Sequence, residues 1–395
     1  MKILVINTGS SSIKYQLFQM DDQSVLASGL IEKIGETTSK HTYKTHAGKK
    51  IFDDPVTSHE EGLKQVVNLI TDNSVGVIVE KSEIKAIGHR VVHGGETFQK
   101  PCIIDEAVLN AVRKNISLAP LHNPANITGI EVAQKIFPAA TQVGVFDTAF
   151  HHTMPPKAFH YAVPLELYRE YKIRRYGFHG TSHHYVALQA AKELGKSLSE
   201  SNLITVHIGN GASITAIKNG KSIDTSMGLT PLEGLIMGTR SGDIDPAIPY
   251  FLTTQSDKDI NDINNLLNKE SGMKGICGMN DFRDIRTARN QGDQNAQLAF
   301  EMYVYRIKKY IGAYCFALGQ VDAIIFTAGV GENADDVRWE VCLGLENFGI
   351  KIDKSKNEGG FSVTTAIQQG DSKVKLLVIP TNEELMIAIE TKKLL

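Results

Sequence analysis

The chain has 395 residues, of which 42% are hydrophobic and 22% are charged, and its formal net charge is −2. A chain of this length exceeds what a single hydrophobic core usually serves, so we expect two domains. The near-neutral charge and the dispersed basic residues exclude any electrostatic reason to expect nucleic acid or an anionic membrane as a partner.

Targeting signals and cysteines point to one compartment. The N-terminal apolar run is too short for a secretory signal. No apolar run approaches the roughly 18 residues that a membrane helix needs. The four cysteines lie far apart and form no CxxC pair. These features predict a cytoplasmic protein in a reducing environment.

Strand-like apolar runs alternate with helical patterns along the chain, which is typical of the α/β class. The expected strands, in chain order, are residues 3–6, 141–146, 203–208, 323–326 and 375–379. The polar residues 35–50 predict a loop or a hairpin extension. Apolar residues at helical spacing within residues 254–272 predict a surface helix. Thr381 and Glu384 predict a capping box for the terminal helix. Thr181 or Ser182 is the expected N-cap of the helix that follows His179.

Two segments of the chain share one design. Residues 4–14 read as an apolar strand, a tight Gly/Ser turn and a second strand, and residues 205–215 repeat this pattern. Chance similarity of two hairpins is the alternative. If the repeat reflects duplication, two copies of one α/β module leave a cleft between them, where ligands tend to bind.

Three glycine-rich strand ends are candidate phosphate sites: residues 7–12, 209–211 and 329–333. Their backbone N–H groups and hydroxyls form concavities that hold phosphate oxygens. Lys14 could add positive charge beside the first of them. Each turn alone is equally consistent with a plain hairpin, since Asn and Gly favour turns.

Other nucleotide and hydrolase signatures fail. Ala190 and Thr215 stand where a P-loop requires its first glycine, and Ala334 replaces the third glycine of a dinucleotide fingerprint. The G-x-S-x-G elbow is absent. P-loop kinases, Rossmann dehydrogenases and α/β-hydrolases are therefore excluded.

Three basic residues lie in short segments that contain glycine on both sides of them, namely Arg90, His179 and Arg240. An arginine fork matches the geometry of carboxylate and phosphate. A structural salt bridge is the alternative for each arginine. The spacing of His179, His183 and His184 resembles a zinc site, but no Cys or acidic residue completes a ligand set.

Two acidic residues complete the candidate chemistry. Asp147 ends a predicted strand, and an N-cap or turn role is its alternative. Glu383 begins the last helix and is the freer of two neighbouring carboxylates, because the capping box accounts for Glu384. We therefore expect Glu383 to bind a magnesium ion.

With these residues assembled, the sequence resembles the acetate kinase (acetokinase) family essentially from end to end. The motifs that carry the resemblance are NTGSSSIK (7–14), GHRVVHGG (88–95), FDTAFH (146–151), YGFHGTSH (176–183), HIGNG (207–211), MGTRSGD (237–243), DFR (281–283), GVGEN (329–333) and PTNEE (380–384). The family belongs to the acetate and sugar kinase, heat-shock 70 and actin superfamily.

The resemblance implies two duplicated actin-like (ribonuclease H-like) α/β domains with an interdomain active-site cleft. Residues 1–150 with 381–395 are expected to form the N-terminal domain, and residues 151–380 the nucleotide-binding domain. The implied reaction is reversible, direct in-line transfer of the ATP γ-phosphoryl group to acetate, giving acetyl phosphate and ADP, a step toward acetyl-CoA biosynthesis. A propionate kinase of the same family, or a non-catalytic ATPase switch of the actin or chaperone type, are the alternatives.

The resemblance also implies roles for single residues. Arg90 is the implied contact of the substrate carboxylate and Asp147 the active-site acid, while His179 and Arg240 are similar to the transition-state stabilisers of the family. All four are expected to be catalytic.

The remaining implied groups bind metal and nucleotide. Asn7 and Glu383 are similar to residues that bind Mg²⁺, for which Mn²⁺ could substitute. The implied ATP-binding residues are Lys14, His207, Ile208, Gly209, Asn210, Gly211, Asp281, Phe282, Arg283, Gly329, Val330, Gly331, Glu332 and Asn333. A homodimer is the implied assembly, and acetate and ATP are the implied small-molecule substrates.

Overall fold

The computed structural model describes residues 1–120 and 122–395, and they divide into two compact units. Unit 1 comprises Met1–Phe150 and Asn382–Leu395, and unit 2 comprises His151–Thr381. The chain therefore completes most of unit 1, builds all of unit 2, and returns to unit 1 with its last helix.

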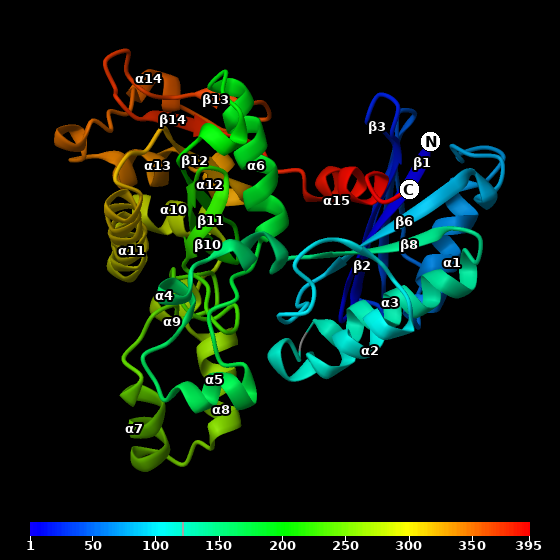
Figure 1. Ribbon diagram of the computed structural model, residues 1–395, viewed down its shortest axis with the longest axis horizontal. Helices are drawn as coiled ribbons and strands as arrows, with labels where there is room; N and C mark the ends of the chain where they lie inside the picture. The colour runs from blue at the N-terminus through cyan, green and yellow to red at the C-terminus, as the bar shows by residue number, and fades with distance from the viewer. Residues whose placement is uncertain (121) are drawn as a thin grey trace. The chain divides into compact units, whose positions relative to one another are not determined.

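Unit 1 is a mixed sheet with helices on both faces (Figure 1). Its strands are β1 (Lys2–Gly9), β2 (Ser12–Gln19), β3 (Ser24–Glu32), β4 (Lys40–Thr45), β5 (Gly48–Phe52), β6 (Ile84–Val91), β7 (Cys102–Ile103) and β8 (Thr141–Phe146). Its α-helices are α1 (His59–Ile70), α2 (Glu106–Lys114), α3 (Asn123–Ile136) and α15 (Glu383–Lys392).

Alternation of side chains along β1 assigns the two faces of the unit 1 sheet. Leu4 and Ile6 belong to a hydrophobic core that includes residues of α1 and α3. Ile3 and Val5 belong to a second core, which includes residues of α15. Asn7 continues the odd-numbered series, so its side chain lies on the face that α15 covers.

Unit 2 is built on a second mixed sheet, with the long helix α11 and the helix α6 packed against it (Figure 1). Its strands are β9 (Leu203–Ile208), β10 (Ala212–Lys218), β11 (Lys221–Thr225), β12 (Ala323–Thr327), β13 (Thr365–Ala366) and β14 (Lys375–Val378). Its α-helices are α4 (Pro156–Phe159), α5 (Leu165–Tyr171), α6 (Gly180–Glu193), α7 (Ala247–Gln255), α8 (Ile260–Asn265), α9 (Gly272–Cys277), α10 (Phe282–Asn290), α11 (Gln294–Leu318), α12 (Ala328–Asn333), α13 (Asp335–Cys342) and α14 (Lys354–Asn357).

The two sheets have the same central topology. In unit 1, β1, β2 and β3 form an antiparallel meander, and β1, β6 and β8 are parallel neighbours. In unit 2, β9, β10 and β11 form the meander, and β9, β12 and β14 are the parallel neighbours. The duplication inferred from the two hairpins is therefore confirmed, and so is the α/β class.

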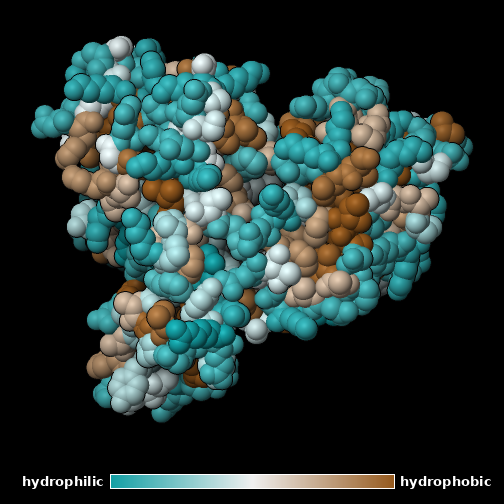
Figure 2. Space-filling model, viewed as in Figure 1, coloured by the Kyte–Doolittle hydropathy of each residue, from teal (hydrophilic) through white to brown (hydrophobic). Residues whose placement is uncertain are grey.

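The expected strands coincide with β1, β8, β9, β12 and β14, with differences of a few residues at their ends. Residues 35–50 contain β4, the whole β4–β5 turn and the first part of β5, so the hairpin extension is confirmed. Residues 254–272 contain α8 and a following π-helical turn, as their spacing predicts. Exposed apolar side chains, Tyr250 and Phe251 among them, occur on α7 near this segment, where Figure 2 shows apolar and polar groups intermixed.

Both helix caps predicted near the site are wrong. Asn382, not Thr381, caps α15, and its side chain accepts a hydrogen bond from the Leu385 N–H at 3.0 Å. Glu384 pairs with Lys14 instead, at 2.6 Å. At α6 the N-cap position belongs to His179, which lies outside the Thr181–Ser182 pair expected to cap it.

None of the helices in the described part of the chain combines the length and apolarity needed to cross a membrane.

Candidate active site

Four predicted site residues lie at the carboxyl end of the unit 1 sheet. Asn7 is on β1, Arg90 is on β6, Asp147 directly follows β8, and Glu383 opens α15. Because β1, β6 and β8 are parallel neighbours, their carboxyl ends meet at one edge of the sheet. Helix α15 packs against all three strands.

Gly88 shows which face Arg90 occupies. A Cβ atom at Gly88 would lie 2.6 Å from the Cγ2 atom of Ile387 and 2.5 Å from the Oγ1 atom of Thr391, so only glycine permits this approach of α15. Arg90 is two residues further along β6 and therefore shares this face. Asn7, Arg90 and the first turn of α15 are thus brought to the same side of the sheet.

Arg90 and Asp147 form a bidentate ion pair. The Nη2 atom of Arg90 donates to Oδ2 of Asp147 at 2.7 Å, and Nε donates to both carboxylate oxygens at 3.1 and 3.2 Å. The Asp147 side chain is 1% exposed and that of Arg90 is 21% exposed. Burial alone would lower the pKa of Arg90, but the carboxylates of Asp147, Glu383 and Glu384 outweigh it and raise the pKa. Arg90 is therefore a permanent cation whose direction is set by Asp147, and its Nη1 donates to no acceptor among the described residues.

Glu383 presents a buried carboxylate oxygen that has no donor. Its Oε1 atom makes no hydrogen bond with any described residue. Burial, followed by the charges of Asp147 and Glu384, raises the pKa of Glu383, although Arg90 and Lys14 oppose this rise. A buried carboxylate in such a setting gains stability when it meets a cation.

The candidate residues of unit 2 meet at the β9–β10 turn. His179 has a left-handed backbone, with φ of 56°, and precedes the first turn of α6. Its Nδ1 atom is 2.9 Å from Oγ of Ser213, and its ring stacks on His207 with 4.2 Å between centroids. A backbone conformation this unusual for a non-glycine residue indicates that the surroundings hold the side chain in a specific direction.

Arg240 lies beside the same turn. A Cβ atom at Gly211 would be 3.5 Å from Nε2 of His179 and 3.8 Å from Nη1 of Arg240, so both groups face this glycine. Arg240 donates to the carbonyl oxygen of Pro231 at 3.2 Å, and no carboxylate in the described residues pairs with it. Burial lowers the pKa of Arg240 without a compensating acid. Its charge, unlike that of Arg90, is not paired with a carboxylate among the described residues.

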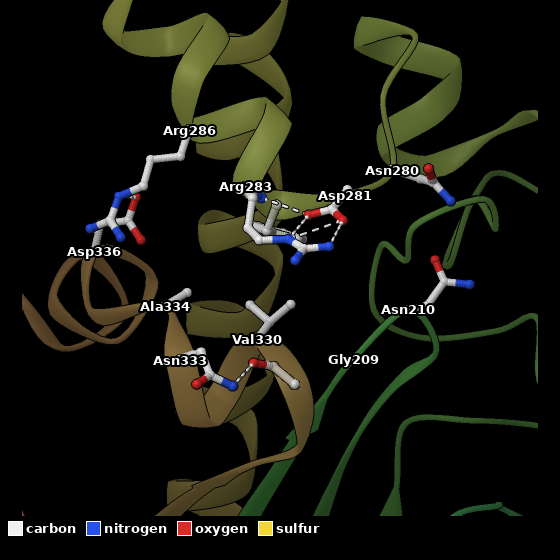
Figure 3. Close-up of a pocket in the computed structure, with 12 residues that line it drawn as sticks. Gly209, Asn210, Asn280, Asp281, Arg283, Arg286, Val330, Asn333, Ala334 and Asp336 are labelled. Carbon is white, nitrogen blue, oxygen red and sulfur yellow. Dashed lines mark hydrogen bonds and ion pairs between the residues drawn. The ribbon is translucent and has the colours of Figure 1, made fainter. Parts of the chain in front are cut away.

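A cavity of about 730 Å³ in unit 2 adjoins this turn (Figure 3). It is lined by Gly209, Asn210, Asn280, Asp281, Phe282, Arg283, Arg286, Gly329, Val330, Asn333, Ala334 and Asp336. Asp281 caps α10, and Arg283 folds back onto it with an Nε–Oδ1 distance of 3.0 Å. This hydrogen bond lowers the pKa of Asp281 to about 2. Asn333 is held by the carbonyl oxygen of Gly329 at 2.8 Å, as Figure 3 shows.

The structure separates the implied nucleotide residues into those that line the cavity and those that do not. Outside the lining are Lys14, His207, Ile208, Gly211, Gly331 and Glu332. Glu332 accepts hydrogen bonds from the backbone N–H groups of Ala328, at 2.8 Å, and of Thr381, at 3.1 Å. Ala328 has a φ of 64°, so Glu332 holds the strained entry into the glycine-rich segment.

Four lining residues were missed by the sequence analysis, namely Asn280, Arg286, Ala334 and Asp336. Asn280 precedes the DFR motif, and Arg286 lies one helical turn beyond Arg283 on α10. Ala334 directly follows the GVGEN motif, and Asp336 lies two residues further on. Their proximity to motifs was the available signal, and helical periodicity would have identified Arg286.

The fold and the site define a class of protein. Two α/β units share a meander followed by parallel strands, and in each the first hairpin carries a glycine-rich turn. In one unit that turn borders a cavity large enough for a nucleotide. The chain is thus built from two actin-like α/β domains.

Comparison with known proteins narrows this class to one family. The sequence profile of the Acetokinase family matches residues 2–389, and the chain belongs to this family. The acetate kinase of Maridesulfovibrio salexigens is 55% identical over 396 residues, covering 100% of each chain. The crystal structure of Porphyromonas gingivalis acetate kinase superposes with a TM-score of 0.95 at 46% identity, covering 99% of each chain. A propionate kinase from Francisella tularensis superposes with a TM-score of 0.94 at 44% identity, covering 100% of each chain.

Proposed function

We propose that this chain transfers the γ-phosphoryl group of ATP to acetate in one in-line step, and that it also runs the reverse reaction. Family membership and relatives named acetate kinase support a kinase with a carboxylate acceptor. The observation that carries the choice of acceptor is the bidentate Arg90–Asp147 pair. An alcohol acceptor must lose a proton to a base, whereas here the acid at the strand end is committed to an arginine.

A carboxylate acceptor needs no base at neutral pH, because its pKa lies near 4. Its difficulty is electrostatic, since one anion must approach another. Arg90 binds the acetate carboxylate through the guanidinium edge that Asp147 leaves unused. Asp147 acts on the substrate through Arg90, whose fork it orients.

Arg240 and His179 act on the transferring phosphoryl group. The unpaired guanidinium of Arg240 compensates the charge spread over the equatorial oxygens, and His179 donates a hydrogen bond beside it. Both groups face Gly211, where a Cβ atom would lie at ordinary van der Waals distance from each of them.

The donor set of unit 1 fits a divalent cation, which we assign as Mg²⁺. Glu383 offers a buried carboxylate oxygen without a donor, and the Asn7 side chain adds an amide oxygen on the same face of the sheet. Groups of three or more His, Cys, Asp or Glu side chains that could hold a metal do not occur in the described residues. This agrees with a metal that takes one carboxylate and completes its shell with phosphate oxygens and water. When bound, the ion neutralises phosphate charge.

The cavity of unit 2 holds the nucleoside of ATP. Phe282 and Val330 supply apolar surface, while Asn210 and Asn333 supply amide groups. Gly209 and Gly329 bring backbone close to the ligand. The phosphates then extend toward Gly211 and Arg240.

We also propose a cytoplasmic homodimer. Exposed apolar residues on α11, including Leu298, Met302, Tyr305 and Phe316, support an interface on this helix. Light scattering coupled to gel filtration measures the mass directly.

Capture of the acyl phosphate by hydroxylamine tests the function. With ATP and Mg²⁺, kcat/KM should be highest for acetate, lower for propionate and lower again for butyrate. One methylene is worth about 1–3 kcal/mol, so propionate should retain measurable activity. A higher kcat/KM for propionate would assign the chain as a propionate kinase. ATP hydrolysis without acyl hydroxamate would indicate an ATPase switch.

A further inference from the structure

A buried chain of hydrogen bonds runs from His179 into the unit 2 sheet. The Oγ atom of Ser213 on β10 lies 2.9 Å from Nδ1 of His179 and 2.7 Å from Nε2 of His183. The Nδ1 atom of His183 in turn lies 2.7 Å from Oγ1 of Thr205 on β9. Ser213, His183 and Thr205 are all fully buried.

His183 is neutral in this setting. Burial, followed by the nearby rings of His151 and His207, lowers the pKa of His183 well below its ordinary value. A neutral imidazole has one donor nitrogen and one acceptor nitrogen, and a hydroxyl donates a single hydrogen. The hydrogen bonds that link Thr205, His183, Ser213 and His179 can therefore run in only two possible directions.

One direction leaves a buried donor without an acceptor. If Nδ1–H of His183 donated to Thr205, the hydroxyl hydrogen of Thr205 would have no acceptor among the described residues. Leaving a buried donor unsatisfied is costly. In the other direction Thr205 donates to His183, His183 donates to Ser213, and every hydrogen of the chain is used. Ser213 must then donate to Nδ1 of His179.

We propose that Ser213 and His183 are positioning residues that hold His179 as the neutral Nε2–H tautomer, directed at the transferring phosphoryl group. His179 then contributes a directed hydrogen bond, and Arg240 contributes the positive charge. The functional part of this inference rests on the proposed role of His179 in phosphoryl transfer.

The groups around His179 favour the same form. His207 stacks on its ring from β9, His183 reaches it through Ser213, and Arg240 lies beside the same glycine as its Nε2 atom. The fixed charge of Arg240 disfavours a second cation here. Since a neutral Nε2–H donor is already present at neutral pH, His179 needs no proton from solvent to act.

Nuclear magnetic resonance of the full-length protein labelled with ¹⁵N-histidine tests the tautomer directly. The signals of His179 are assigned by their loss in His179→Asn. We expect a protonated Nε2 and a bare Nδ1 at pH 7. An Nδ1–H tautomer or an imidazolium at pH 7 would overturn the inference. This measurement does not depend on which acid is phosphorylated, so it separates the inference from the proposed function.

Kinetics of Ser213→Ala test the consequence. We expect kcat to fall about tenfold to a hundredfold, less than the roughly 10²–10³ for losing a transition-state donor itself. The KM values for ATP and acetate should change less than about threefold, because uniform binding is retained. The His179 tautomers should become mixed.

Ser222→Ala is the matched control. Ser222 on β11 is also buried and bonds to Nδ1 of His151 at 3.0 Å, so this variant likewise loses a buried Ser–His hydrogen bond. Its kcat and the His179 tautomer should stay close to those of the wild type. An equal loss of kcat in both serine variants would refute positioning.

Thr205→Val tests the direction of the chain. It removes the terminal donor with little change in volume, so the His179 tautomers should become mixed and kcat should fall less than in Ser213→Ala. An unchanged tautomer in Thr205→Val would contradict the assigned direction.

Discussion

Two arginines in similar glycine-flanked contexts have opposite electrostatic surroundings. Arg90 is bound along its Nε–Nη2 edge by Asp147 and is influenced by two further carboxylates. Arg240 has only a backbone carbonyl oxygen and a methionine sulfur within hydrogen-bonding range among the described residues. The first is suited to hold an anion in a fixed orientation, and the second to meet charge that develops during reaction.

Replacing Arg240 should therefore affect the chemical step. For Arg240→Ala we expect kcat to fall by roughly 10²–10³, with a much smaller change in the KM for ATP. Arg283→Ala is the comparison, since Arg283 lines the nucleotide cavity and should chiefly raise the KM for ATP. Steady-state kinetics of both variants measure these effects. A near-normal kcat in Arg240→Ala would reject the role of Arg240 in the chemical step.

Removing Arg90 should affect folding as well as activity. Arg90→Ala removes the bidentate ion-pair partner of the buried Asp147 carboxylate, which costs about 3–5 kcal/mol. The double variant Arg90→Ala/Asp147→Asn should recover part of this loss, because the amide carries no charge. Urea unfolding measures the difference, and acetate saturation should be impaired in both variants. If the double variant were no more stable than the single one, the buried charge would not be the cause.

His89 should make stability depend on pH. Its Nε2 atom is 2.8 Å from Oε1 of Gln142, and burial lowers its pKa to about 4. The unfolded chain binds the proton with the ordinary value near 6.5, so the stabilisation is complete above pH 6.5 and is lost as pH falls toward 4. The difference between the two pKa values of His89 corresponds to about 3 kcal/mol in the free energy of unfolding. His89→Gln should flatten this part of the stability profile, whereas the exposed control His46→Gln should leave it unchanged.

At the scale of elements, the approach of α15 to β6 positions Glu383. Gly88→Ala places a Cβ atom 2.5 Å from Oγ1 of Thr391, so α15 must shift. We expect a loss of about 1–3 kcal/mol in stability and a higher Mg²⁺ requirement for activity. Gly312→Ala on α11 is the control, because its Cβ position has no atom within 4 Å, and it should be neutral or stabilising. Equal effects of the two changes on Mg²⁺ dependence would contradict this role for α15.

The positions of the strands were predicted from the sequence more accurately than the residues that cap the helices. Apolar runs identified β8 and β9 because a buried strand must be apolar whatever surrounds it. The expected cap at Thr381 failed because tertiary contacts take its groups. Its N–H donates to Glu332 at 3.1 Å, and its hydroxyl pairs with Ser182 at 2.8 Å. Local capping rules do not include such partners.

At the scale of the whole molecule, the duplication could be recognised from the sequence because both hairpins have glycine-rich turns between two strand-like segments. The shared sheet order follows from it. The sequence also identified most of the cavity through its motifs. It did not reveal that Asp147 is bound to Arg90, or that His183 reaches His179 through Ser213, because these pairs join residues far apart in the chain or depend on a third side chain.

The stereochemical course of the reaction tests direct transfer from ATP to the carboxylate. The substrate is ATP whose γ-phosphorus is made chiral with oxygen isotopes, and the configuration is read in the acyl phosphate formed from acetate. A single in-line displacement predicts inversion at phosphorus. Retention of configuration would require a phosphorylated enzyme intermediate and would contradict the account.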